Sequence, residues 1–210
     1  MIGDEVKRAV EDLCVEVETR ALAYHLPEDA AVVAWDTETT GLQGVVVQLG
    51  VVVLDAHGRE VGVDSRLFAP LPTFPMEPGA FAVHKISPKR QADEGEPVSK
   101  CLQAFGELAQ SASFRGVPLV AHNAAFDKRM LRNTATAAGC AFPEITTLCT
   151  MNLGRTVYTD ANGKKKRPKN RDLYNLLIGG APEDAQLHDA VEDARLTAHS
   201  FLAGRRNGYW

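Results

Sequence analysis

Apolar positions follow a helical spacing in the first 25 residues of the chain and a strand-like pattern directly after them. Six of them recur at steps of three and four, which predicts an amphipathic helix over residues 4–25: Val6, Val10, Leu13, Val17, Ala21 and Tyr24. Pro27 ends this helix, because proline lacks the amide donor that a helix interior needs. We expect the stripe to pack on the domain, and a protein partner is the alternative occupant. The apolar run over residues 30–35 predicts a central strand buried on both faces.

The rest of the pattern predicts one α/β domain with a mixed sheet. Strands over residues 45–54 and 59–68 form a meander with the first strand, and the prolines between residues 70 and 78 then interrupt regular structure. Further helices are expected at residues 97–111, 124–138, 148–157, 172–178 and 189–203, and further strands at 117–121 and 142–147. Strands followed by helix–strand–helix alternation indicate a domain over residues 30–204, with an extension at 1–29 and a tail at 205–210.

Composition places the chain among globular proteins. Its 210 residues are 45% hydrophobic and 24% charged, which allows a packed core. No apolar run reaches the roughly 18 residues that cross a membrane, and the first residues do not resemble a secretory signal. The four cysteines form no CxxC pair, so we expect reduced thiols and an intracellular location, cytoplasmic or nuclear.

Charge is unevenly distributed. The net charge is −4, but residues 164–171 (KKKRPKNR) hold six positive charges, so the other 202 residues carry −10. An acidic body with one basic loop suits an enzyme that binds cations and grips phosphates beside them. A solvated loop or a nuclear localisation signal would have the same composition.

Two carboxylates follow the first predicted strand. Asp36 and Glu38 are two residues apart, so their side chains share one face, and such oxygen ligands suit Mg²⁺ or Mn²⁺. Two solvated acids at a strand end are the alternative. However, Asp36 directly follows an apolar run, where a carboxylate costs desolvation free energy unless it is paired or binds a cation. We therefore expect a metal site.

A further acid lies in the first turn of a predicted helix. Asn123 is expected to cap this helix, which places Asp127 near the strand ends. The helix dipole favours an acid there, so this position alone is also typical of a structural residue.

The last acidic stretch opens the final helix. Asp189 and Glu192 have the spacing of a capping box, which brings His188 and Asp193 together. An imidazole beside a carboxylate forms a structural ion pair, or it is a base beside a metal ligand.

Together these residues resemble the DnaQ-like, or DEDDh, 3′–5′ exonucleases, the family that includes the proofreading subunits of bacterial replicative polymerases. Three motifs carry the resemblance: Asp36–Leu42 (DTETTGL), His122–Asp127 (HNAAFD) and His188-x4-Asp193. Shorter matches occur at residues 48–50, 83–87 and 147–150, and the resemblance covers about residues 31–204. Lys85 stands where many members have glycine.

The resemblance implies a ribonuclease H-like α/β fold, a five-stranded mixed sheet flanked by helices. It implies an enzyme that hydrolyses the 3′-terminal phosphodiester of single-stranded nucleic acid and releases nucleoside 5′-monophosphates. Two Mg²⁺ ions about 4 Å apart, replaceable by Mn²⁺, would be held by Asp36, Glu38, Asp127 and Asp193. His188, which assigns the h subtype, would deprotonate the attacking water.

Substrate contacts are implied for a second group of residues. The 3′-terminal nucleotide would be held by Thr39, Gly41, Leu42, His84 and Asn123, although Leu42 also suits ordinary packing. Upstream phosphates would meet Lys164, Lys165, Lys166, Arg167, Lys169 and Arg171. The motifs do not separate DNA from RNA, because that choice depends on contacts to the 2′-OH. DNA is favoured; RNA 3′-end trimming is the alternative, and a catalytically silent binding module is a further one.

Overall fold

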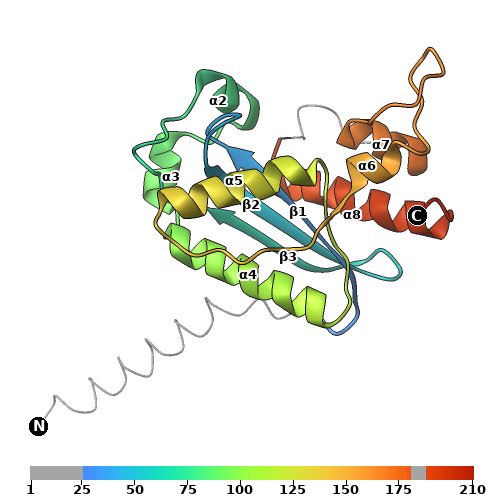
Figure 1. Ribbon diagram of the computed structural model, residues 1–210, viewed down its shortest axis with the longest axis horizontal. Helices are drawn as coiled ribbons and strands as arrows, with labels where there is room; N and C mark the ends of the chain where they lie inside the picture. The colour runs from blue at the N-terminus through green and yellow to red at the C-terminus, as the bar shows by residue number, and fades with distance from the viewer. Residues whose placement is uncertain (1–25, 181–187) are drawn as a thin grey trace, which may run out of the picture.

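The computed structural model describes residues 26–180 and 188–210 (Figure 1). The described strands form a five-stranded mixed sheet in the order β3-β2-β1-β4-β5, with β1, β2 and β3 antiparallel and β4 and β5 following in parallel. The strands are β1 (Ala30–Thr39), β2 (Val46–Asp55), β3 (Glu60–Leu67), β4 (Leu119–Ala121) and β5 (Leu148–Cys149). The helices are α2 (Pro78–His84), α3 (Pro88–Glu94), α4 (Val98–Phe114), α5 (Ala124–Ala137), α6 (Thr150–Gly154), α7 (Asn170–Leu177) and α8 (Ala190–Arg206). The predicted helix over residues 4–25 lies outside the described residues.

Helices flank the sheet, with α4 and α5 on one face and α8 on the other (Figure 1). Alternate residues of β1 enter two different cores. Val33 and Trp35 pack among α4 and α5, where the rings of Trp35 and Phe105 lie 5.0 Å apart. Val32 and Ala34 pack against α8. The prediction that β1 is buried on both faces is confirmed.

The alternation along β1 continues past the predicted end of the strand. Residues 30–35 were expected to form it, but β1 runs to Thr39 because β2 pairs with it along that length. Asp36 and Glu38 therefore lie within the strand, on the face that Val32 and Ala34 present to α8. The start of α8 is the part of the chain that these carboxylates face.

Proline accounts for two differences between prediction and structure. The proline-rich segment over residues 70–78 was expected to lack regular structure, but Pro78 is the first residue of α2, where the fixed φ of proline favours a helix start. Pro88, outside that segment, begins α3 in the same way. The fifth strand was expected at residues 142–147, yet β5 lies at Leu148–Cys149. Pro143 has no amide donor for a ladder hydrogen bond, and Thr147 instead accepts a hydrogen bond from Trp35 Nε1 at 3.0 Å.

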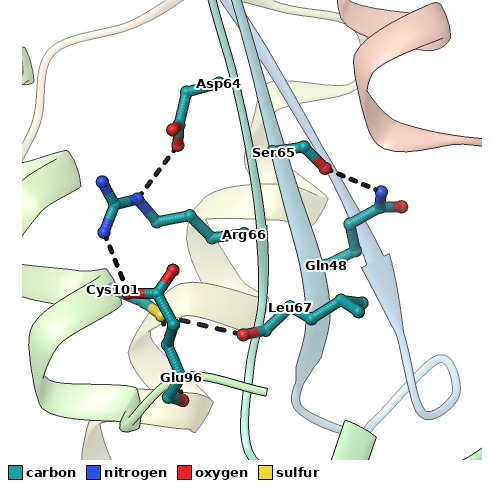
Figure 2. Close-up of polar contacts among 7 residues, drawn as sticks. All are labelled: Gln48, Asp64, Ser65, Arg66, Leu67, Glu96 and Cys101. Atoms are coloured by element: carbon teal, nitrogen blue, oxygen red, sulfur yellow. Dashed lines mark hydrogen bonds and ion pairs between the residues drawn. The ribbon is translucent and has the colours of Figure 1, made fainter. Parts of the chain in front are cut away.

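A polar network ties the edge strand β3 to the segment before α4 (Figure 2). The Arg66 guanidinium donates to Asp64 at 3.0 Å and to Glu96 at 3.3 Å, and the Cys101 thiol faces the Leu67 carbonyl. Burial raises the pKa of the Cys101 thiol to about 12, so this cysteine stays protonated. Cys101, Cys140 and Cys149 are free thiols, as predicted, and Cys14 lies outside the described residues. None of the helices described is both long and apolar enough to span a membrane.

Candidate metal-binding active site

Three of the predicted metal ligands meet at one point. Asp36 and Glu38 come from β1, and Asp193 comes from the first turn of α8. Each offers a carboxylate oxygen, and these oxygens lie within 4.8 Å of one another. Oxygen atoms at this spacing are the ligands that Mg²⁺ and Mn²⁺ prefer, so the donor set suits a hard divalent cation.

Asp127 is not one of these three, but it comes from α5 on the other side of β1 and lies near enough for its charge to repel Asp36 and Glu38. Thr37 lies between Asp36 and Glu38 along the strand, and its hydroxyl donates to Asp127 Oδ1 at 2.7 Å. The other oxygen, Oδ2, is buried without a hydrogen-bond partner in the described structure. A buried carboxylate oxygen is normally satisfied, and a cation bound by the cluster would satisfy this one.

Asn123 precedes α5 as predicted, but it does not cap the helix through its side chain. Its backbone has φ 65° and ψ 39°, in the left-handed region, and no cap hydrogen bond forms from the amide. Asparagine tolerates this conformation better than most residues. The turn it makes, not a side-chain cap, directs α5 so that Asp127 faces the cluster.

Electrostatics support a site built for positive charge. Burial, and then repulsion from neighbouring carboxylates, raises the pKa of Glu38 to about 8 and the pKa of Asp36 well above its ordinary value. Burial also raises the pKa of Asp127 to about 7, against the hydrogen bond from Thr37, and raises the pKa of Asp193. Carboxylates that repel one another in a buried site bind a divalent cation at low cost, since the cation removes the repulsion.

The start of α8 brings His188 beside Asp193, as the spacing predicted. His188 has φ 69°, and its backbone N–H donates to Asp193 Oδ2 at 3.2 Å, while its side chain is exposed. The capping box is only half formed. Asp189 caps α8 by accepting from Val191 N at 3.0 Å, but Glu192 pairs with Arg195. The competing guanidinium explains why Glu192 does not return to the cap.

A cavity of about 410 Å³ opens beside Glu38. Four of the predicted substrate residues line it: Thr39, Gly41, Leu42 and His84. Leu42 is 72% exposed at its rim, so the alternative of ordinary core packing is wrong for this side chain. The other lining residues are Thr37, Glu77, Gly79, Ala80, Val83 and Phe126. Asn123 does not line the cavity.

His84 lines the cavity with its ring, but both ring nitrogens are bonded to backbone. Nδ1 accepts from Ile86 N–H at 3.0 Å, so Nε2 carries the proton and donates to the Thr39 carbonyl at 3.2 Å. Burial lowers the pKa of His84, which favours this neutral form. His84 therefore braces the end of β1 and has no ring nitrogen free for a ligand.

Sequence reasoning missed Phe126 and Glu77 as cavity residues. Phe126 directly precedes Asp127, and Arg129 lies over its ring at 5.5 Å while donating to the Leu42 carbonyl at 3.2 Å. The sequence did offer a signal for Phe126, because it is an aromatic residue directly before the predicted metal ligand Asp127 in the second motif. Glu77 carried no such signal, because only the fold brings it over Gly41.

The basic segment ends beside the carboxylate cluster. Thr159 and Lys165 form a β-bridge, and the hairpin they close projects beyond α6 and α7 (Figure 1). His122 Nε2 donates to the Pro168 carbonyl at 3.1 Å, and Asn170 Nδ2 donates to the Asp193 carbonyl at 2.9 Å. These two contacts fix the end of the hairpin next to the backbone of Asp193.

The raised carboxylate pKa values predict the pH dependence of the metal-free protein. A group whose pKa is higher in the folded state binds more protons there, so the free energy of unfolding falls as the pH rises towards the folded pKa. Histidines with lowered pKa act in the opposite direction, but only below about pH 6.5. In EDTA, unfolding by urea should therefore need less denaturant at about pH 8.5 than at about pH 7. Millimolar Mg²⁺ should reverse this fall, and stability that stays level or rises across this interval without metal would contradict the electrostatic account.

Comparisons with known proteins agree with this geometry. Residues 33–201 match the family model RNase_T, described as exonuclease. The chain is 31% identical to exodeoxyribonuclease 10 of Escherichia coli K12 over 180 residues, which cover 83% of this chain and 69% of that protein. It is 28% identical to a PolC-type DNA polymerase III of Caldanaerobacter subterraneus over 81% of this chain, but it spans only 11% of that relative.

Solved structures share the fold. Exonuclease X in complex with 5′-overhanging duplex DNA superimposes with a TM-score of 0.56 at 27% identity, covering 85% of this chain and 93% of that one. The nuclease domain of 3′hExo, a DEDDh family member bound to rAMP, gives a TM-score of 0.65 at 11% identity, covering 86% and 94% of the two chains. The predicted ribonuclease H-like fold is confirmed.

Proposed function

Because the chain belongs to the RNase_T family of DnaQ-like exonucleases, we propose that it hydrolyses the 3′-terminal phosphodiester of single-stranded DNA in a metal-dependent reaction. The observation that carries the proposal is the meeting of Asp36, Glu38 and Asp193 beside Asp127, whose buried Oδ2 has no protein partner among the described residues. A binding module that holds no cation would have no use for carboxylates that repel one another.

Four carboxylates would hold divalent cations, for which we propose two Mg²⁺ ions that Mn²⁺ can replace: Asp36, Glu38, Asp127 and Asp193. Bound there, the cations would neutralise the charge of the reacting phosphate and lower the pKa of the attacking water. The cavity next to Glu38 would take the terminal nucleoside, with Leu42 and Phe126 against its apolar surface.

His188 would act as the general base. Its side chain is exposed at the edge of the cluster, and the hydrogen bond from its backbone to Asp193 fixes its position. The imidazole accepts a proton from water as the water oxygen attacks phosphorus. The bond from phosphorus to the 3′ oxygen of the preceding nucleotide breaks, so the product is a nucleoside 5′-monophosphate and a strand shorter by one.

Support for DNA comes from the names of one sequence match and one structural match. One is named an exodeoxyribonuclease and the other was solved with duplex DNA, at 31% and 27% identity. The test is to incubate a short DNA strand and its RNA counterpart with Mg²⁺ or EDTA and to identify products by chromatography. Nucleoside 5′-monophosphates released faster from DNA, only with metal, would support the proposal. Faster release from RNA would replace DNA by RNA as the substrate, and release of dinucleotides or longer pieces would contradict terminal hydrolysis.

We further propose that the basic hairpin contacts phosphates upstream of the 3′ end. Replacing Lys164, Lys166 and Arg167 by Gln should weaken binding of single-stranded DNA of any sequence. It should also reduce the slope of log K against log salt by up to about 2, because each lost phosphate contact removes about 0.7. Fluorescence anisotropy across a salt series measures both quantities, with Asp36→Asn as the common background to prevent cleavage.

The matched control removes two basic residues elsewhere. Lys89 and Arg90 lie on α3, where each pairs with an acid of the same helix. Replacing both by Gln should leave the salt slope unchanged. A slope that also stays unchanged in the hairpin variant would show that Lys164, Lys166 and Arg167 do not contact the DNA strand.

A further inference from the structure

Gln48 is a buried polar residue beside the carboxylate cluster, and the proposed reaction gives it no role. It lies on β2 directly opposite Glu38 of β1, and it is 3% exposed. Its position in the strand alternation places it on the face covered by α8, the same face as Val52 and Leu54. A polar side chain buried there must satisfy its hydrogen-bonding groups, and its partners show what it holds.

The carboxamide of Gln48 binds the start of α8 through both of its ends. Nε2 donates to Asp189 Oδ2 at 2.9 Å, and Oε1 accepts from the backbone N–H of Ala190 at 3.3 Å. Nε2 also lies 3.1 Å from the Ser65 hydroxyl on β3 (Figure 2). Because a carboxylate only accepts, the amide nitrogen must face Asp189, so the orientation of the side chain is determined by its partners.

Gly50 completes the contact on the same face of β2. A Cβ atom at this position would lie 2.3 Å from the backbone carbon of Ala190, so the strand and the first turn of α8 touch directly. Gln48 and Gly50 thus form a seat for the helix start, which we call the α8 seat. Gly50 lets the backbone of α8 approach β2 closely, and the hydrogen bonds of Gln48 set the direction in which α8 begins.

Asp189 links the α8 seat to the residues that precede and follow it in the chain. Both of its oxygens are used, Oδ2 by Gln48 and Oδ1 by Val191 N at 3.0 Å. His188 precedes it in the left-handed conformation and donates its N–H to Asp193, one of the proposed ligands. Any rotation of the Asp189 cap would therefore move the base and the ligand together.

We infer that Gln48 and Asp189 are positioning residues, which fix His188 and Asp193 relative to Asp36 and Glu38 through a buried amide–carboxylate hydrogen bond. The inference rests on the proposed function, since those four residues form its reaction site. Asp189 lies close enough to the cluster to repel its carboxylates. Its two occupied oxygens explain why it is not assigned as a metal ligand.

The experiment reverses the polarity of the pair. Gln48→Glu places two carboxylates against each other. Asp189→Asn places two amides against each other: if their oxygens accept from the N–H groups of Val191 and Ala190, their two NH2 groups face one another. In the double variant, the new amide on the helix cap donates to the new carboxylate on β2, and asparagine remains a good helix cap. Each single variant should lower kcat by about 10- to 100-fold with less change in KM, as losses of residues that orient metal ligands do. The double variant should recover to within about threefold of the native rate.

A second readout does not depend on activity. Hydrogen exchange of the metal-free protein should show faster exchange at residues 189–194 in both single variants, with protection restored in the double variant. Calorimetric titration with Mn²⁺ should follow the same order. Gln103→Glu is the matched control, because Gln103 donates to Glu107 at 2.9 Å in an exposed pair on α4 and should change none of these quantities.

Three results would overturn the inference. Single variants with native kcat and native exchange would show that the pair positions nothing. A double variant as impaired as Asp189→Asn would make Asp189 a ligand in its own right. Loss of global stability to urea in proportion to the loss of rate would make the seat merely structural. A native protein that hydrolyses no nucleic acid would defeat the proposed function, but hydrogen exchange would still test the pair.

Discussion

Asp36→Asn is expected to reduce hydrolysis of single-stranded DNA by about 10³-fold, the scale on which loss of one charge-stabilising group at a reaction centre is felt. Asp36 is the residue on which the repulsion of Asp127, Asp193 and Glu38 converges. An amide keeps the shape of the side chain but removes the charge that would hold a cation. Single-turnover rates at saturating Mg²⁺ measure the loss, and calorimetry measures the accompanying loss of cation affinity.

The same substitution should stabilise the metal-free protein. Removing one of the mutually repelling carboxylates relieves repulsion, so the midpoint of thermal unfolding in EDTA at about pH 8.5 should rise, and the added stabilisation by Mg²⁺ should shrink. Asp93→Asn is the control, since Asp93 is exposed in an ion pair with Lys89 on α3. Near-native hydrolysis by Asp36→Asn, or equal effects of both variants, would remove Asp36 from the site.

His188→Ala is expected to lower kcat by about 10²- to 10⁴-fold, the usual contribution of a general base. The fold should survive, because the His188 imidazole is exposed and its backbone, which an alanine retains, makes the hydrogen bond to Asp193. Cation affinity should stay close to native, which separates this variant from Asp36→Asn. Stopped-flow rates and calorimetry on the same preparation give both values.

A change of backbone conformation is the competing explanation for any effect at His188. Its φ of 69° is tolerated by asparagine better than by alanine. His188→Asn should therefore keep the conformation and lose the base, and its rate should fall as far as that of His188→Ala. His57→Ala, on the exposed turn after β2, should be native. Recovery of activity in His188→Asn would mean that the residue serves the turn and not the chemistry.

Much of the site was predictable because it depends on local periodicity. The apolar run of β1 and the two-residue spacing of Asp36 and Glu38 determine a shared face, and the spacing from Asp189 determines that His188 meets Asp193. The contacts between the sheet and the start of α8 were not predictable in the same way. The contact of Gln48 with Asp189 joins residues 141 positions apart, and no local pattern marks it.

Errors arose where one residue type has two structural uses. Pro78 was treated as an interruption, but it begins α2. Asn123 was expected to cap through its side chain, but it supplies a left-handed backbone instead. Glu192 accepts a hydrogen bond from Arg195 and does not cap the helix, so only the Asp189 half of the capping box forms. In each case the residue type allows two structural uses, and the sequence pattern alone does not decide between them.

The most direct test of the central claim is the polarity of strand shortening. A DNA strand labelled at its 5′ end should give a ladder that shortens one nucleotide at a time from the 3′ end with Mg²⁺, and no ladder with EDTA or with Asp36→Asn. A phosphorothioate at the 3′-terminal linkage should block it, whereas one at the 5′ end should not. Shortening from the 5′ end, internal cuts, or a ladder that persists in EDTA would contradict the assignment of these carboxylates to a metal-dependent 3′–5′ exonuclease.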